Sequence, residues 1–96
     1  MKVRWTEQAL SRLADIEDFV AAADPTAAIA RTTRLIARGD SLAKYPRRGR
    51  RVPELPASGL RELVDGPYRL VYRVHAGRVE ILTVFEGHRI PPPGTT

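Results

Sequence analysis

The feature that most constrains the fold of this chain is a pair of β-rich segments joined by a short turn. The segments Tyr68–Val74 and Val79–Phe85 are rich in Val, Tyr, Ile and Phe, residue types that favour strands. Four residues separate them, including Gly77, which can adopt a positive φ, so an antiparallel hairpin is expected. A shorter apolar segment, Leu60–Val64, is followed by the turn-forming triplet Asp-Gly-Pro. The sequence therefore predicts a three-stranded antiparallel meander.

The meander has two different faces, because successive side chains of a strand point to opposite sides. One face is apolar and comprises Tyr68, Leu70, Tyr72 and Val74, with Val79, Ile81 and Phe85 from the last strand. We expect this face to be buried against helices. The opposite face comprises Arg69, Val71 and Arg73. It is either ordinary solvated surface or a binding surface that Arg61 joins.

The residues before the meander have the periodicity of two helices. Thr6 can cap the first helix, which is predicted from about Glu7 to Ala22. Asp24 and Pro25 form a helix start, and Pro46 ends the second helix. The apolar stripe of this second helix comprises Ala28, Ile29, Thr32, Leu35, Ile36, Leu42 and Ala43.

These elements predict one α+β domain of order β-α-α-β-β-β over residues 1–90, with a disordered tail at 91–96. Lys2–Trp5 can add an edge strand, and the helical hairpin packs on the apolar face of the small antiparallel sheet. The side chains expected between hairpin and sheet are Leu13, Ile16, Ile29, Ile36, Leu70, Tyr72 and Ile81.

Composition points to an anionic partner. The chain has 96 residues and a formal charge of +5, and its basic residues are almost all arginine, with Lys2 and Lys44 the only lysines. Arginine matches carboxylate or phosphate, so a nucleic acid or an acidic protein segment is expected as partner. No apolar run approaches a membrane span, and the absence of cysteine fits a cytoplasmic location.

The arginines concentrate in two places outside the meander. The first group lies about one turn apart on the second helix and comprises Arg31, Arg34 and Arg38. The second lies in a Pro- and Gly-rich loop and comprises Arg47, Arg48, Arg50 and Arg51. The loop is either solvated surface or a contact for an acidic partner or a phosphate backbone.

Chemistry at the sheet surface is the remaining hypothesis. No cofactor motif is present, and His75 and His88 lack the spacing of metal ligands. Cleavage of RNA needs proton transfer, which a histidine can perform, and stabilisation of phosphate charge, which arginines can provide. The candidates for such a site are Arg61, Arg69, Arg73, His88 and Arg89. His88 beside Arg89 is equally compatible with a surface turn.

In the order of these features the chain resembles the RelE/ParE superfamily of toxins from bacterial toxin–antitoxin modules, over about residues 2–90. The matching pieces are Val3-Arg-Trp-Thr6 leading into a helix, Asp24-Pro25-Thr-Ala-Ala28, Leu42…Pro46…Gly49-Arg50…Pro53-Glu54, Arg61-Glu62-Leu63, Tyr68–Val74, Ile81-Leu-Thr-Val84 and His88-Arg89. The resemblance implies the same β-α-α-β-β-β fold and a cognate antitoxin that wraps and silences the toxin.

The superfamily resemblance implies two alternative targets. ParE-like members inhibit DNA gyrase, whereas RelE-like members cleave mRNA in the ribosome. The helical hairpin and the loop around Gly49 and Glu54 look more like the ParE branch, which we favour. Target contacts are then expected at Arg61, Arg69, Arg73, His88 and Arg89. Antitoxin contacts are expected at Arg31, Arg34, Arg38, Arg47, Arg48, Arg50 and Arg51.

Overall fold

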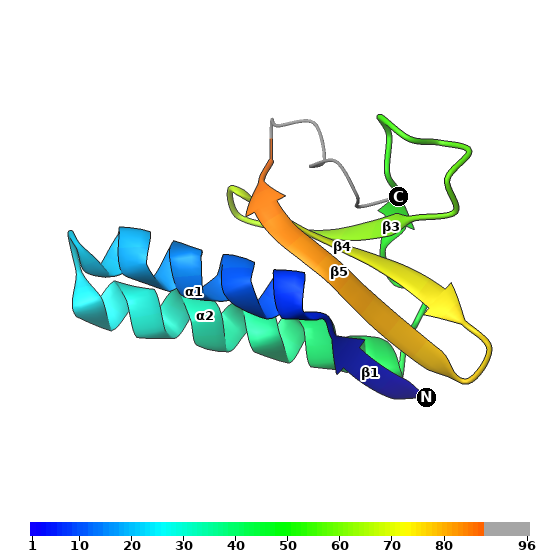
Figure 1. Ribbon diagram of the computed structural model, residues 1–96, viewed down its shortest axis with the longest axis horizontal. Coiled ribbons are helices and arrows are strands. Elements are labelled where there is room, and N and C mark those ends of the chain that lie inside the picture. The colour runs from blue at the N-terminus through cyan, green and yellow to red at the C-terminus, as the bar shows by residue number, and fades with distance from the viewer. Residues whose placement is uncertain (88–96) are drawn as a thin grey trace.

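The computed structural model describes residues 1–87, in which two helices cover one face of a five-stranded sheet (Figure 1). The elements are β1 (Lys2–Trp5), α1 (Glu7–Ala21), α2 (Pro25–Asp40), a 3₁₀ turn η1 (Ser41–Ala43), β2 (Arg50–Arg51), β3 (Arg61–Asp65), β4 (Tyr68–His75) and β5 (Arg78–Glu86). The strand order is β1-β5-β4-β3-β2. β1 runs parallel to β5, and the other pairs are antiparallel. The predicted α+β architecture is confirmed.

Local signals in the sequence start both helices where predicted. Thr6 caps α1, since its hydroxyl accepts a hydrogen bond from the backbone N–H of Ala9. Asp24 caps α2 in the same way through Ala27, and Pro25 occupies the first turn. The α-helix ends at Asp40 rather than continuing to Pro46, because the chain tightens there into η1.

The main core lies between the helices and the inner face of the sheet. Its buried members include Leu13, Leu35, Leu70, Tyr72 and Ile81. Ile16 is partly buried at its edge. A close approach at the end of α2 fixes the helix against β1, since a Cβ on Gly39 would lie 2.3 Å from the Trp5 ring.

The prediction that Ile29 and Ile36 belong to this core is wrong. They are 63% and 42% exposed. The inner face of α2 is formed by Ala28, Leu35 and Gly39, and each isoleucine follows one of these residues in sequence. The next residue along a helix points about 100° away, so burial of the first turns the second toward solvent.

A smaller second core lies on the outer face of the sheet, where Val71 and Phe85 pack against Val52 and Leu60. Phe85 was predicted on the inner face, and this is wrong because β5 contains a bulge. Val71 pairs with Thr83 whereas Tyr72 pairs with Ile81, so Leu82 is an extra residue. The bulge reverses the alternation beyond it and turns Phe85 outward.

Candidate functional site

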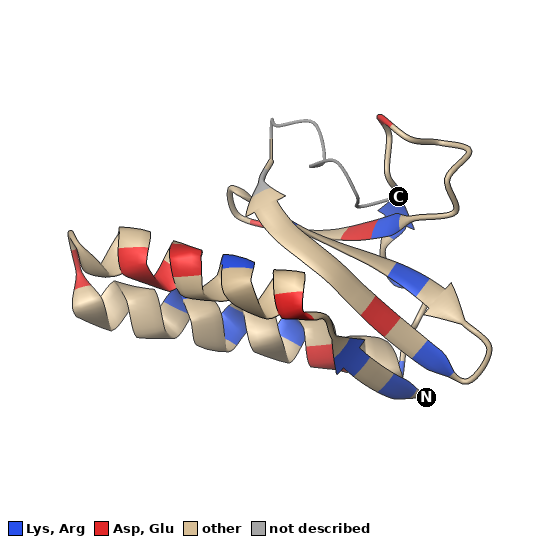
Figure 2. Cartoon of the chain, in the orientation of Figure 1, with Lys and Arg blue, Asp and Glu red and all other residues tan. Residues whose placement is uncertain are grey.

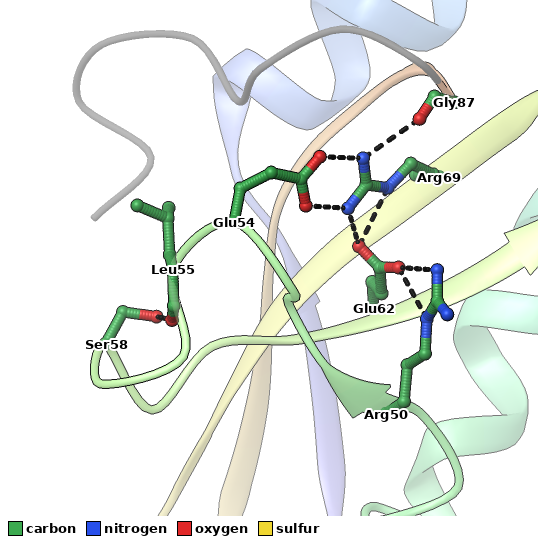
Figure 3. A network of polar contacts seen from close by, with 7 residues as sticks. All are labelled: Arg50, Glu54, Leu55, Ser58, Glu62, Arg69 and Gly87. Atoms are coloured by element: carbon green, nitrogen blue, oxygen red, sulfur yellow. Dashed lines mark hydrogen bonds and ion pairs between the residues drawn. The ribbon is translucent and has the colours of Figure 1, made fainter.

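The outer face carries a buried ion-pair network centred on Arg69 (Figure 3). Arg69 Nε donates to Glu62 at 2.8 Å. Both terminal nitrogens donate to Glu54, and Nη2 also donates to Glu62. Glu62 is completely buried and also accepts from Arg50 at 2.8 Å. One guanidinium therefore connects β4 with β3 and with the segment between β2 and β3.

The same guanidinium also holds the end of the last strand. Arg69 Nη1 donates to the Gly87 carbonyl at 2.9 Å, and its guanidinium lies 5.3 Å from the centroid of the Phe85 ring. The Arg69 hydrogen bonds lower the pKa of Glu54 from 4.5 to about 2, and the Glu54 hydrogen bonds raise the pKa of Arg69. Both groups are therefore charged throughout the physiological range.

Arg69 was predicted to lie on an exposed face and contact the target. The prediction of exposure is wrong. Its side chain is only 5% exposed, because the segment between β2 and β3 folds over the outer face and brings Glu54 with it. The sequence contains the two acidic partners, but an alternating strand pattern does not reveal that a distant loop covers one face.

The other two candidate arginines of the meander also contact backbone carbonyls. Arg61 Nη1 donates to Gly49 O at 2.8 Å, and Arg73 Nη1 donates to Ser58 O at 3.1 Å. Both residues are partly buried. His88 and Arg89 lie outside the described residues. Arg73 lies on the outer face with Arg69, but the expectation that Arg61 joins them there is wrong, because Arg61 pairs directly with Tyr72 and so lies on the inner side of the sheet. The two faces therefore hold the 49–58 segment from different sides.

Tyr72 holds the start of that segment from the inner face of the sheet. Its hydroxyl accepts a hydrogen bond from the Gly49 N–H at 2.9 Å, inside the protein. Burial raises the pKa of the Tyr72 phenol above its usual value of 10, so the group stays protonated at neutral pH. Tyr72 therefore acts as a structural hydrogen-bonding group.

The three arginines of α2 share a single carboxylate at the end of β3. Arg34 pairs with Asp65 at 2.8 Å, Arg31 at 3.5 Å and Arg38 at 3.7 Å, and the Asp65 side chain is 5% exposed. Arg38 also donates to Val64 O. Three cations on one anion leave a net positive charge. Figure 2 shows basic residues along α2 and mostly acidic residues along α1.

The predicted loop arginines lie in a second basic region, the basic loop, which we define as residues 44–51. Lys44, Tyr45, Arg47, Arg48 and Arg51 are all exposed. Lys44 and Arg48 lie 5.6 Å and 5.0 Å from the centroid of the Tyr45 ring. Arg48 also contacts Ser41 at the end of α2, so the basic loop adjoins the arginines of the helix.

Sequence reasoning missed Asp65, Lys44 and Tyr45 as members of these two regions. An aromatic residue inside a run of cations was a readable signal at Tyr45. Asp65 had no such signal, because the triplet Asp-Gly-Pro predicts only a turn and the arginine partners are about 30 residues away in sequence.

The described part of the chain has neither a metal site nor a membrane-spanning helix. Residues 1–87 contain no group of three or more His, Cys, Asp or Glu side chains that could hold a metal ion. His75 instead contacts Glu80 at 3.1 Å. No helix in the same range combines the length and the apolar character that crossing a membrane requires.

Comparison with known proteins places this geometry in a family. The model of the ParE toxin of type II toxin–antitoxin systems, parDE, matches residues 3–91. Y4kP of Sinorhizobium fredii (strain NBRC 101917 / NGR234) is 42% identical over 90 residues, covering 92% of this chain and 90% of Y4kP. Toxin RelE2 of Caulobacter vibrioides is 40% identical over 90 residues, covering 93% of this chain and 98% of RelE2.

The fold matches as well. A solved structure of the chromosomal ParDE TA system from P. aeruginosa superimposes with a TM-score of 0.75, covering 90% of this chain and 95% of the matched chain. At 23% identity this likeness concerns the fold alone. The family match and the two sequence relatives extend over nearly the whole chain, and the chain therefore belongs to the ParE toxin family of type II toxin–antitoxin systems, within the RelE/ParE superfamily.

Proposed function

We propose that this toxin arrests bacterial growth by binding and inhibiting DNA gyrase in the cytoplasm, with no chemical step of its own. The observation that carries the proposal is the internal engagement of Arg61, Arg69 and Arg73. A ribonuclease needs guanidiniums that can meet the developing phosphate charge. Here Arg69 is held by two carboxylates, and Arg61 and Arg73 donate to backbone carbonyls.

The remaining proposed target contacts are partly exposed Arg61 and Arg73, together with His88 and Arg89. Binding can use such residues even when each also supports the fold, since a contact needs only the outer part of a guanidinium. Catalysis has a stricter geometric requirement than binding, because a general acid or base must lie within hydrogen-bonding reach of the proton that it transfers.

We also propose that a cognate antitoxin neutralises the toxin by lying along α2. Arg34 is 67% exposed although it pairs with Asp65. Next to the arginines of α2, Val64 of β3 accepts a hydrogen bond from Arg38 through its carbonyl, and its side chain is 46% exposed. A segment that alternates acidic and aliphatic residues would match both the charge and the apolar surface. Such a segment would become ordered on binding.

The alternative is a RelE-like, ribosome-dependent mRNA endonuclease, which is favoured by the name of the 40% identical RelE2. Two assays separate the targets. Purified toxin is added to gyrase in a supercoiling assay, and separately to a translating extract in which mRNA lengths are followed. We expect inhibited supercoiling and intact mRNA. Normal supercoiling with rapid mRNA cleavage would overturn the proposal.

His88 gives the mutational version of this test. For a gyrase inhibitor, His88→Ala should reduce growth arrest only mildly, because no proton is transferred. For a ribonuclease, loss of the general acid or base slows the reaction by about 10²–10⁴-fold. Co-expressed antitoxin should still bind the variant, which verifies that it folds.

The antitoxin surface is tested at Arg34, which is the most exposed of the three α2 arginines. Arg34→Gln should weaken antitoxin binding and reduce its dependence on salt, because an exposed ion pair is screened by ions. Arg12→Gln on α1 is the matched control, with the same loss of charge on the neighbouring helix. Equal affinities for wild type and Arg34→Gln would contradict this placement.

A further inference from the structure

The basic loop is an unusually uncompensated concentration of charge. Its eight residues include five cations, which are Lys44, Arg47, Arg48, Arg50 and Arg51. Within residues 1–87 only Arg50 of these five pairs with a carboxylate, that of Glu62. Like charges so close together repel one another, which raises the free energy of the isolated protein. A polyanion bound at the loop would relieve that repulsion.

The loop backbone is also held in one conformation. The Gly49 N–H is bonded to the buried Tyr72 hydroxyl, and the Gly49 carbonyl to Arg61. Gly49 is packed so tightly that an added Cβ would lie 2.5 Å from Glu62 O. The backbone at Gly49 is therefore fixed before any partner binds. Fixing it in advance lowers the entropy that a partner's binding would cost.

Tyr45 adds a second type of contact. Its side chain is 49% exposed, and Lys44 and Arg48 lie over its ring. The cation–π contact holds Arg48 in place, while the exposed part of the ring remains able to stack on a planar ligand. Cations that follow a backbone and an aromatic ring that accepts a base are the two features of nucleic-acid-binding surfaces.

We propose that the basic loop binds the sugar–phosphate backbone of a nucleic acid. The sequence left an acidic protein segment open for the same arginines, and the geometry disfavours it here. Residues 44–51 contain no aliphatic side chain beyond Pro46, so an acidic–aliphatic segment would find little to bury. The surface between α2 and β3 offers that combination instead, because Arg38 donates to the carbonyl of Val64, whose side chain is 46% exposed.

This inference goes beyond the proposed gyrase inhibition and does not depend on it. The same phosphate chemistry would be met in gyrase-bound DNA and in ribosome-bound mRNA. The experiment therefore tests the three sources separately, with a fluorescent 20-nucleotide duplex DNA, the same strand as single-stranded DNA, and its RNA equivalent. Binding of the purified full-length toxin is followed by fluorescence anisotropy at several salt concentrations.

The decisive variant combines Lys44→Gln, Arg47→Gln and Arg51→Gln, because none of these side chains has a carboxylate partner among the described residues. For duplex DNA, each lost phosphate contact reduces the slope of log K against log salt by about 0.9, so a reduction of about 2–3 is expected. The matched control combines Arg4→Gln, Arg12→Gln and Arg78→Gln. It removes the same charge from β1, α1 and β5.

Equal losses in the two triple variants would overturn the proposal, because binding would then follow total charge alone. Absence of binding at low salt would overturn it as well. Equal competition by a poly-glutamate peptide would show that the loop does not prefer nucleic acid. The conservative double variant Arg47→Lys, Arg51→Lys should retain binding, which separates loss of charge from any disturbance of folding.

Tyr45→Ala tests the ring. It should weaken single-stranded DNA or RNA by about 5-fold or more, and duplex DNA by less, since only an unpaired base can stack on the ring. The result for gyrase is independent of this one. If the loop binds DNA while supercoiling is unaffected, the proposed function fails and the inference stands. If the triple loop variant inhibits gyrase but no longer binds DNA, both stand as separate properties.

Discussion

Arg69 and the arginines of the basic loop are the same residue type in opposite situations. Arg69 is 5% exposed and bonded to Glu54, Glu62 and the Gly87 carbonyl. Arg47 and Arg51 are exposed and have no carboxylate partner among the described residues. A buried cation must be neutralised inside the protein, whereas an exposed one is neutralised by water, ions or a partner. The number of arginines therefore says little about binding until the position of the carboxylates is known.

The largest test of this comparison is Arg69→Ala. It leaves Glu62 completely buried with Arg50 alone, and removes the bond to the Gly87 carbonyl. Breaking a buried ion pair by removing one partner costs about 3–5 kcal/mol. The free energy of unfolding, measured by urea denaturation, should fall by this amount. A change below about 1 kcal/mol would mean that the network contributes little to stability.

Tyr72→Phe tests the junction between the two regions. The substitution keeps the buried ring but leaves the Gly49 N–H without its acceptor. An unsatisfied buried donor costs about 1–3 kcal/mol, which urea denaturation can measure. Hydrogen exchange at Gly49 should accelerate more than exchange in α1. Unchanged protection at Gly49 would indicate that the loop is anchored by Arg61 alone.

The pH dependence of stability tests the ion pair between Glu54 and Arg69. The pKa of Glu54 is about 2 in the folded state and 4.5 for the unconstrained group. The contribution of ionised Glu54 to folding stability is therefore fully present above pH 4.5. The contribution is lost as the pH falls through the folded value. Wild type should therefore lose thermal stability between pH 4.5 and about 2 more steeply than Glu54→Gln. Parallel curves of Tm against pH would contradict this pairing.

The smallest effect on stability is expected for the exposed arginines of the basic loop. Arg47→Gln and Arg51→Gln together should change the free energy of unfolding by no more than about 0.5 kcal/mol, because surface substitutions away from specific contacts are nearly neutral. A measurable gain would indicate relief of repulsion within the loop. A loss of more than about 1 kcal/mol would show that these side chains support the fold after all.

Much of the fold could be predicted because its signals are local. Caps at Thr6 and Asp24, helical periodicity, and the turn at Gly77, which adopts φ 78°, all act within a few residues. The errors arose where distant segments decide. Ile29 is exposed because the packing of Ala28 and Leu35 fixes the rotation of α2, and Phe85 faces outward because of the bulge at Leu82.

The candidate site was predictable only in part, for the same reason. The arginines of α2 and of the basic loop could be identified from the sequence, since runs of charge are visible there. The pairing of Arg69 with Glu54 could not, because the two residues are 15 positions apart and meet only after the intervening segment has folded over the sheet. The assignment of any arginine to gyrase or antitoxin stays a prediction.

The parallel pairing of the first strand with the last has a consequence for how the toxin is made. Lys2 pairs with Arg78 and Trp5 with Ile81, so β1 can pair only after residues far later in the chain have been synthesised. Contacts between such distant residues form slowly, because a long loop must close first. Until β5 has emerged, β1 has no strand to pair with, and the five-stranded sheet cannot be completed. A toxin translated only as far as β4 is therefore an incomplete sheet, and its activity should arise only after β5 has been synthesised.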